Sequence, residues 1–370
     1  MTAIGMHVLL IHLSGTPLYA AEIANSLLKL GNEVDALVAE RNVDENYFNE
    51  DISISTVGIS SNKETLLRSL SPLTYYRLLK EIKTIDPDVI HITQGFFWLN
   101  PVLPFLTSYS LVFTDHEPEE TNDVTFYDRT QLYTWSKHHM RSVADSIIVH
   151  GEYLKSVLMS KKIPEDKIKA LDHGTYRYYR QFDSRQDKDK NELNILFFGL
   201  IADYKGIDVF GEAIPAIMEN CPRATVTIAG GGDIEKYLSD EVVSLDSVRI
   251  YDEFIPDNQV GQLFRQADVV VLPYKSGSQS GVLTIAYEYR TPVVVTDVGG
   301  LPEVVDNGET GYVVPPNDSD ALASSILDVI KYPEKKQQME RKINEKVESE
   351  LSWDIICEEL VEHYNSLLRG

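Results

Sequence analysis

The sequence predicts an α/β protein of two domains, each built on a doubly wound parallel sheet. The chain has 370 residues, which is enough for two domains of ordinary size. Short strand-like runs alternate with longer helical patterns from one end to the other, which is typical of parallel sheets with crossover helices. The runs are nearly all apolar, as expected when helices cover both faces of a sheet.

The first half of the chain is expected to form an N-terminal Rossmann-like domain over residues 1–178. Helical patterns cover Tyr19–Leu30, Tyr75–Ile85 and Arg129–Val143. The run IKALDHG, near the end of this half, is expected to be one more strand. The other strands are predicted at residues 7–13, 33–39, 88–94, 110–117 and 146–151.

The second half repeats this rhythm and is expected to form a C-terminal Rossmann-like domain over residues 193–350. The stretch RQFDSRQDKDKNE has a single apolar residue, Phe182, so we predict a linker at 179–192. Two domains joined there leave a cleft that the carboxyl ends of both sheets can face, and open α/β sheets bind ligands at those ends. The strands of this half are predicted at residues 193–199, 224–230, 248–254, 268–274 and 292–299.

The last segment, residues 351–370, contains an amphipathic pattern at 352–368. Apolar residues at helical spacing predict a helix here. We expect this helix to pack on a domain surface or to cross back to the first domain.

Composition limits the class of protein. The formal net charge of −23 argues against nucleic acid as a partner, since phosphate backbones require a basic surface. Cys221 and Cys357 lie far apart without metal-ligand spacing, which fits a reducing compartment. The N-terminus lacks the basic region of a signal peptide, and no apolar stretch approaches the length of a membrane helix. We therefore expect a soluble cytoplasmic protein.

A glycine turn follows the first strand of each half. Gly15 and Thr16 precede a helix that begins near Pro17, and its first amides can receive an anion or sugar hydroxyls. The alternative is a tight βα connection, since a glycine in a first βα loop is common. In the second half Gly199 ends a strand and Lys205 precedes a helix that begins near Ile207. A lysine there costs up to ~1 kcal/mol against the helix dipole, which a diphosphate would offset; the alternative is a solvated surface lysine.

The stretch SGSQSGVL joins a predicted strand to a predicted helix. Ser278 or Ser280 can cap that helix, and backbone amides around Gly281 and Val282 can bind an anion without a charged side chain. The alternative is that the serines only cap.

Further turns of the second half are weaker signals. The triplet that starts with Gly230 and Gly231 allows close backbone approach to a ligand, or only an unusual turn. A second glycine pair follows the strand at 292–299, with Glu303 behind it.

Two histidines stand at strand ends. His116 closes the run LVFTDHE, and His173 ends IKALDHG. A lone histidine is usually structural, but two at strand ends around one cleft favour a ligand site.

Taken together, these elements resemble glycosyltransferases of family 4, which have the GT-B fold. The motifs FFGLIADYKGID, TIAGGG, ADVVVLPY and TPVVVTDVGGLPEVVDNGETGYVVPPND carry the resemblance, in order and at the family's spacing. The resemblance covers essentially the whole chain. It implies a retaining, metal-independent transfer of a sugar from a nucleotide diphosphate sugar to an acceptor. It implies no cofactor, and a donor that lies mainly against the C-terminal domain.

The resemblance also implies roles for particular residues. Lys205 matches the family lysine that contacts the diphosphate, and His116 matches a histidine near the transferred sugar. Phe254 and Ile255 match the region that borders the base. We therefore predict Lys205 and His116 as catalytic residues. The predicted donor-binding residues are Gly15, Thr16, His173, Gly199, Gly230, Gly231, Phe254, Ile255, Ser278, Gln279, Ser280, Gly281 and Val282.

The chain departs from the family pattern at three positions. Leu200 stands where the family often has an arginine that pairs with the lysine on the phosphates. Gly277 and Ile285 fall on the two glutamates of the family's E-x7-E pattern, so both carboxylates are missing.

A branch of the family carries SQSG with an apolar residue at the second of these positions. In that branch Ser278, Gln279, Ser280 and helix amides would replace the carboxylate contacts. Glu288 lies close to the same helix face as Ile285 and is an outside candidate for the ribose.

Three questions stay open at this stage. The missing arginine and glutamates leave a non-catalytic GT-B module, which binds a sugar, a nucleotide or a partner enzyme, as the alternative to an enzyme. The acceptor can be a glycan, a lipid-linked molecule or a small molecule; the donor base and sugar and the oligomeric state are also open. Arg68, Arg77, Lys80 and Lys83, in the segment 66–83, can dock on an anionic membrane surface or form a solvated helix face.

Overall fold

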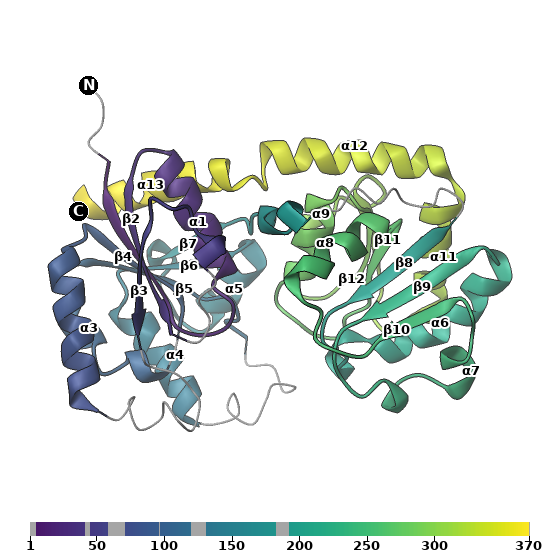
Figure 1. Ribbon diagram of the computed structural model, residues 1–370, viewed down its shortest axis with the longest axis horizontal. Coiled ribbons are helices and arrows are strands. Elements are labelled where there is room, and N and C mark those ends of the chain that lie inside the picture. The colour runs from purple at the N-terminus through teal and green to yellow at the C-terminus, as the bar shows by residue number, and fades with distance from the viewer. Residues whose placement is uncertain are drawn as a thin grey trace. The chain divides into compact units, whose positions relative to one another are not determined.

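The computed structural model describes residues 5–40, 45–57, 71–95, 97–119, 131–182 and 192–369. The chain divides into two compact units, which are shown in Figure 1. Unit 1 runs to Asp172 and also contains the segment from Ser352 onward, and unit 2 is His173–Leu351. Each unit contains one parallel sheet with helices on both faces. The predicted fold class, α/β with two Rossmann-like domains, is confirmed.

The sheet of unit 1 has seven strands in the order β3-β2-β1-β4-β5-β6-β7. The order reverses between β1 and β4, so the carboxyl ends of these two neighbours flank a topological switch point. The half-exposed strand β3 was not predicted, because its Ser/Thr-rich run lacks the apolar pattern of its neighbours. The strands are β1 (His7–His12), β2 (Glu33–Ala39), β3 (Ser53–Val57), β4 (Val89–Gln94), β5 (Ser110–Thr114), β6 (Ser146–His150) and β7 (Ile168–Leu171).

Alternation along the strands of unit 1 determines what each sheet face contacts. In β4, Ile90 and Ile92 face the hydrophobic cluster formed with α3, α4 and α5. His91, between them, faces the opposite side, where its Nδ1 lies 2.6 Å from the hydroxyl of Tyr364 in α13. The helices of unit 1 are α1 (Leu18–Lys29), α3 (Pro72–Ile85), α4 (Gln131–Val143), α5 (Glu152–Ser160) and α13 (Trp353–Arg369), with the short 3₁₀ helices η1 (Glu45–Tyr47), η2 (Phe97–Leu99), η3 (Leu103–Phe105) and η4 (Glu165–Lys167).

The sheet of unit 2 has six strands in the order β10-β9-β8-β11-β12-β13. Here the order reverses between β8 and β11, which pair in parallel. The loops that follow these two strands therefore leave the sheet side by side, at its carboxyl edge. The strands are β8 (Leu193–Phe198), β9 (Ala224–Ala229), β10 (Val248–Tyr251), β11 (Val269–Leu272), β12 (Val293–Thr296) and β13 (Gly311–Val314).

Unit 2 has a hydrophobic cluster on each face of its sheet. One cluster packs β8 against α6 and α11, and the other packs it against α8, α9 and α12. Neighbouring residues of β8 alternate between the two: Phe197 belongs to the first and Leu196 to the second. The helices are α6 (Ile207–Asn220), α7 (Asp240–Val243), α8 (Asp257–Gln266), α9 (Gly281–Glu288), α10 (Leu301–Val304), α11 (Ser319–Lys331) and α12 (Pro333–Ser349), with η5 (Arg177–Phe182), η6 (Asp203–Lys205) and η7 (Ile234–Lys236).

The division between the units falls at Asp172 and His173, before the predicted domain end at 178. The physical reason is that Tyr176 and Tyr179 pack against the core of unit 2 formed with α8 and α9. Residues 179–182 of the predicted linker belong to η5, and residues 183–191 lie outside the described residues. At the other end of unit 2 the chain continues into α13, which packs against α1 in unit 1.

A helix needs about 20 predominantly apolar residues to cross a bilayer. Across the described ranges, no helix is both long enough and apolar enough to do so.

Buried histidines make the stability of unit 1 depend on pH. Burial, and then the charge of His116, lowers the pKa of His12 and of His91 from 6.5 to about 3. Burial also lowers the pKa of His116 and of His363. All four are therefore neutral in the fold at pH 7, whereas in an unfolded chain they would take up protons below pH 6.5.

We expect the free energy of unfolding of unit 1 to fall as the pH drops below 6.5, because the unfolded state then binds more protons. Each fully buried histidine contributes ~1.4 kcal/mol per pH unit below that point. Thermal unfolding measured from pH 7.5 to 5 tests this, and His91→Gln should make the decline shallower. A melting temperature that stays constant over this range would contradict the prediction.

Candidate functional site

The two loops at the switch point of unit 2 form the centre of the candidate site. After β8 the chain passes through η6 into α6, and after β11 it passes through residues 273–280 into α9. Because β8 and β11 are adjacent and parallel, both loops lie at one edge of the sheet.

Backbone contacts hold these two loops together. Gly206 has φ 66°, and a Cβ on it would lie 1.8 Å from the carbonyl oxygen of Pro273. Only glycine allows this approach. The backbone amide of Lys275 donates a 2.8 Å hydrogen bond to the carbonyl of Tyr204. The Lys275 ammonium pairs with Asp208 at 2.7 Å.

Lys205 lies in this junction. Its Nζ donates a 2.6 Å hydrogen bond to the hydroxyl of Tyr274 and lies 3.9 Å from the centroid of the same ring. Tyr274 is only 2% exposed, and its hydroxyl lies 2.8 Å from Oγ of Ser280. These three side chains form a connected polar chain from η6 to the first residue before α9. Sequence reasoning named Lys205 and Ser280 but missed Tyr274, although it stands directly before the serine loop.

The serine loop differs from the prediction in one respect. Ser280 occupies the N-cap position of α9, but within the described ranges its side chain makes no capping hydrogen bond. Its hydroxyl bonds instead to the buried Tyr274, so the predicted cap by Ser280 is wrong. Ser278 is buried, and its carbonyl accepts a 2.8 Å hydrogen bond from the amide of Gly300, after β12. Gly281 is exposed, while Val282 and Gln279 are partly exposed.

The glycine triplet after β9 has a structural explanation. Gly230 has φ 150°, and a Cβ there would lie 1.9 Å from the carbonyl oxygen of Gly199. The next peptide also pairs with this loop, because the amide of Ile201 donates to the carbonyl of Gly231 at 3.0 Å. Gly230 therefore allows close approach of the loops that follow β8 and β9. This close approach requires glycine at position 230 whether or not a ligand binds beside it.

Phe254 and Ile255, predicted to border the base, have different environments. Phe254 is 81% exposed, whereas Ile255 is buried in the core with α8. Leu200, which replaces the family arginine, is exposed.

The segment that opens unit 2 lies against the start of α9. A Cβ on Gly281 would be 3.2 Å from the ring of Tyr176. That ring lies edge-on to His173 at 5.3 Å, and Nδ1 of His173 is 2.8 Å from the carbonyl oxygen of Gly174. The structure therefore brings His173 and Gly281 into one neighbourhood, through a tyrosine that sequence reasoning did not single out.

The outside candidate Glu288 lies at the other end of α9. It is buried and forms an ion pair with Arg180 of η5. Nη2 of Arg180 also donates to the backbone carbonyl of Glu288 at 2.5 Å. In this structure the carboxylate therefore fastens η5 to α9.

The predicted residues of unit 1 lie at the carboxyl edge of its sheet. Gly15 and Thr16 are exposed and precede α1, with Pro17 in the N-cap position. His116 follows β5 by two residues, and its Nε2 lies 2.8 Å from the carbonyl oxygen of Thr93. A carbonyl only accepts, so we assign the ring proton to Nε2 and leave Nδ1 as an acceptor. Burial lowers the pKa of His116, which keeps the ring neutral at pH 7.

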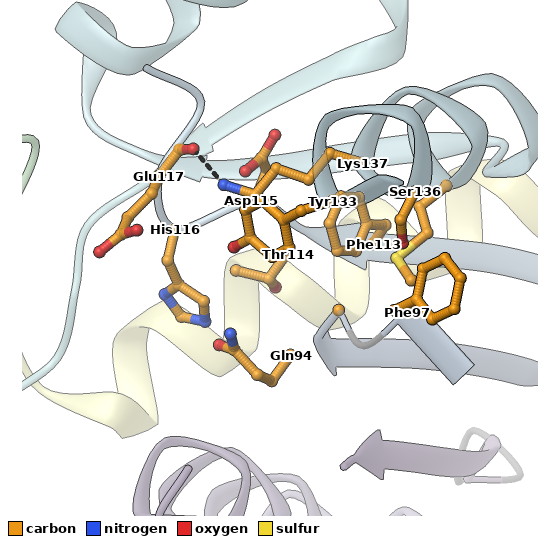
Figure 2. A pocket seen from close by; sticks show the side chains of 12 residues that line it. Gln94, Phe97, Phe113, Thr114, Asp115, His116, Glu117, Tyr133, Ser136 and Lys137 are labelled. Atoms are coloured by element: carbon orange, nitrogen blue, oxygen red, sulfur yellow. Dashed lines mark hydrogen bonds between the residues drawn. The ribbon is translucent and has the colours of Figure 1, made fainter. Parts of the chain in front are cut away.

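A cavity of about 130 Å³ lies beside His116. Figure 2 shows Gln94 close to the His116 ring and Lys137 reaching the backbone of Glu117. The Lys137 ammonium donates to that carbonyl at 2.6 Å. Aromatic rings from η2, β5 and α4 form another part of the wall. The lining residues are Gln94, Gly95, Phe97, Phe113, Thr114, Asp115, His116, Glu117, Tyr133, Ser136, Lys137 and Met140.

The described part of the chain contains no group of three or more His, Cys, Asp or Glu side chains that could hold a metal ion.

Both halves of the chain match known protein families. Residues 192–332 match the family described as glycosyl transferases group 1. Residues 13–175 match the family described as glycosyltransferase family 4.

The curated relatives include proteins named as glycosyltransferases. An uncharacterized glycosyltransferase, MJ1607, of Methanocaldococcus jannaschii is 32% identical over 216 residues, which are 54% of each chain. Glycogen synthase of Mycobacterium tuberculosis is 28% identical over 178 residues, 48% of this chain and 43% of the relative. The chain thus spans about half the length of these curated relatives.

Solved structures match over nearly the full length. Sucrose-phosphate synthase from Thermosynechococcus elongatus has a TM-score of 0.74 at 19% identity, covering 98% of this chain and 99% of that one. Anabaena Alr3699/HepE has a TM-score of 0.73 at 16% identity, covering 98% and 100%. At these identities the likeness shows the fold, which is the GT-B fold. The first half of the chain matches glycosyltransferase family 4, and the second half matches glycosyl transferases group 1.

We expect Gly206→Ala to destabilise unit 2 strongly, because the added Cβ meets the Pro273 carbonyl at 1.8 Å. Gly308→Ala is the matched control: it also has positive φ (84°), but no described atom lies within 4 Å of its Cβ position. The control should cost ~1–2 kcal/mol from the left-handed backbone alone, and Gly206→Ala at least ~2 kcal/mol more. Equal losses in denaturant unfolding would show that the close approach is unimportant.

Proposed function

We propose that the chain transfers a sugar from a nucleotide diphosphate sugar to a glycan, lipid-linked or small-molecule acceptor, with retention of configuration and without a metal ion. One observation carries the proposal. The Lys205 ammonium is linked through Tyr274 to Ser280, the N-cap residue directly before α9. A cation and a helix N-terminus thus lie close together, and each favours an anion such as a diphosphate.

The chemistry follows from where charge develops. As the sugar leaves, negative charge builds up on the diphosphate, and Lys205 and the first amides of α9 stabilise it. These groups supply the positive field that a divalent ion provides in other transferases. The departing diphosphate can take the proton of the acceptor hydroxyl, so no covalent intermediate is needed. His116 would position the transferred sugar.

Neutral groups would hold the rest of the donor. Ser278, Gln279 and Ser280 occupy the region where the family has carboxylates, and the exposed Phe254 ring can stack on a base. Similar structures support a nucleotide donor: Alr3699/HepE was solved with UDP and with UDP-glucose, and a starch synthase from Arabidopsis thaliana with ADP. The serine loop would then represent the SQSG branch of the family.

The cavity beside His116 is our proposed acceptor site. Its volume of about 130 Å³ and its mixture of aromatic and polar walls suit a single hydroxylated ring. The neutral His116 imidazole presents Nδ1 as an acceptor, which fits a hydroxyl donor better than an anion.

A donor screen tests the proposed function. UDP, GDP, ADP and their common sugars are compared by melting shift, and nucleotide release is then followed with an acceptor panel, with and without EDTA. We expect nucleotides of one base to raise the melting temperature, and turnover to persist in EDTA. NMR of the product should show the same anomeric configuration as in the donor. Binding without turnover on any acceptor would favour the non-catalytic module instead.

Lys205→Ala should lower kcat by ~10²-fold, by analogy with the loss of one preorganised electrostatic contact. Lys236→Ala is the matched control, because Lys236 also lies over a tyrosine ring, at 4.9 Å from the Tyr237 centroid, but outside the candidate site. Initial rates at saturating donor measure both. Near-normal turnover in Lys205→Ala would remove the lysine from the mechanism.

We also propose that α3 makes a peripheral contact with the cytoplasmic face of an anionic membrane. Leu73 and Tyr76 are 53% and 64% exposed, and Arg77, Lys80 and Lys83 are exposed beside them; Arg68 lies outside the described residues. Apolar and basic side chains together on one helix favour such a surface.

Vesicle flotation tests this contact. Binding to phosphatidylglycerol vesicles, but not to phosphatidylcholine vesicles, should weaken with salt and be lost in Lys80→Glu/Lys83→Glu. Arg341→Glu/Lys342→Glu, which reverses two exposed charges on α12, should bind as the wild type does. Equal loss in both double variants would mean that net charge alone, and not α3, decides binding.

A further inference from the structure

We infer that Tyr274 is a positioning residue, which holds the Lys205 ammonium at the start of α9 before any donor binds. The effect of Tyr274 on catalysis rests on the proposed function, whereas its contact with Lys205 is present in the protein without a donor. It also gives Ser280 a task other than helix capping.

The contacts of Tyr274 form a directed chain. An ammonium group can only donate, so the Tyr274 oxygen is the acceptor of the 2.6 Å bond from Lys205. Its own hydrogen is then available to Oγ of Ser280, 2.8 Å away. The ring also lies 3.9 Å from Nζ, within the range of a cation–π contact. One side chain thus holds the ammonium through both its hydroxyl and its ring.

Tyr274 is itself held firmly in place. Its ring is buried in the core formed by β11, β12, α8 and α9. Its backbone carbonyl accepts a 2.5 Å hydrogen bond from Oγ1 of the buried Thr296, at the end of β12. The preceding residue, Pro273, is the one whose carbonyl packs against Gly206. The contact between Gly206 and Pro273 therefore positions both Tyr274 and Lys205, because each is next in sequence to one of these two residues.

A fixed partner matters because lysine is flexible. The lysine side chain has a flexible four-carbon stem, so it loses much rotamer freedom when it is ordered. If Tyr274 orders it in advance, less freedom is lost when the diphosphate becomes charged in the transition state. The gain should therefore appear in kcat more than in the KM of the donor.

Tyr274→Phe separates the two contacts, because it keeps the ring and removes the hydroxyl. With the donor that the melting-shift screen identifies, we expect kcat to fall about tenfold while the KM of the donor changes little. Tyr287→Phe is the matched control: Tyr287 is fully buried in the same core, and its hydroxyl bonds Thr310 at 2.8 Å. Equal losses of kcat in both variants would mean a general effect on packing and would overturn the inference.

A second readout does not depend on turnover. Acylation of lysines by an N-hydroxysuccinimide ester, followed by peptide mass spectrometry, reports the reactivity of each amine. In Tyr274→Phe the Lys205 amine should react severalfold faster, because the hydroxyl that stabilised its charged form is gone. Lys275, which pairs with Asp208 at 2.7 Å and Asp203 at 3.1 Å, should react unchanged and serves as the internal reference.

The two measurements distinguish the possible failures. If the wild type neither binds nor turns over a nucleotide sugar but Lys205 reactivity responds to Tyr274→Phe, the proposed function fails and the positioning contact stands. If reactivity and kcat both stay at wild-type values, the inference fails. Should Tyr274→Phe not fold, Ser280→Ala replaces it: the same changes in weaker form support the inference, and unchanged values overturn it.

Discussion

The parallel pairing of β8 with β11 is the constraint on which the candidate site depends. These strands are neighbours in the sheet of unit 2, although they lie far apart in the chain. Lys205 and Tyr274, which their loops bring together, are 69 positions apart. Their loops leave the sheet at one edge, where Gly206 can press against the Pro273 carbonyl. That contact places a lysine, a buried tyrosine and the N-cap residue of a helix together. Without it, η6 and the serine loop would be two unrelated surface turns.

The electrostatics of the site differ from those of the whole protein. The chain carries a formal net charge of −23, which by itself repels an anionic donor. Positive charge must therefore be concentrated locally, and the two loops carry Lys205 and Lys275. Lys275 is paired with Asp203 and Asp208 and serves to hold the loops together. Lys205 is held by the hydroxyl and the ring of Tyr274, which orient its ammonium group. This arrangement supports the proposed donor contacts, in which hydroxyls and amides replace the carboxylates of the family pattern.

Unit 1 shows how one sheet face can carry polar groups without exposing them. Strand alternation puts Ile90 and Ile92 on one side and His91 on the other, where Tyr364 and Thr114 satisfy its two ring nitrogens at 2.6 and 2.7 Å. The last helix, α13, thus covers this face of the sheet, and its Tyr364 contacts a residue 273 positions earlier in the chain. The same burial keeps His116 neutral and makes it a hydrogen-bond acceptor at the edge of the cavity.

Local patterns in the sequence were enough to predict the fold class, most of the strands, the start of α6 at Ile207 and the last helix. These features depend on neighbouring residues, through apolar runs, helical periodicity and glycine turns. β3 was missed because a half-exposed edge strand lacks such a run. Only the tertiary structure decided that Ser280 bonds Tyr274 rather than capping α9, that Gly230 packs on Gly199, and that Glu288 pairs with Arg180. A hydroxyl, a carboxylate or a glycine can serve several partners, and the partner it takes is the one that strand pairing brings within reach.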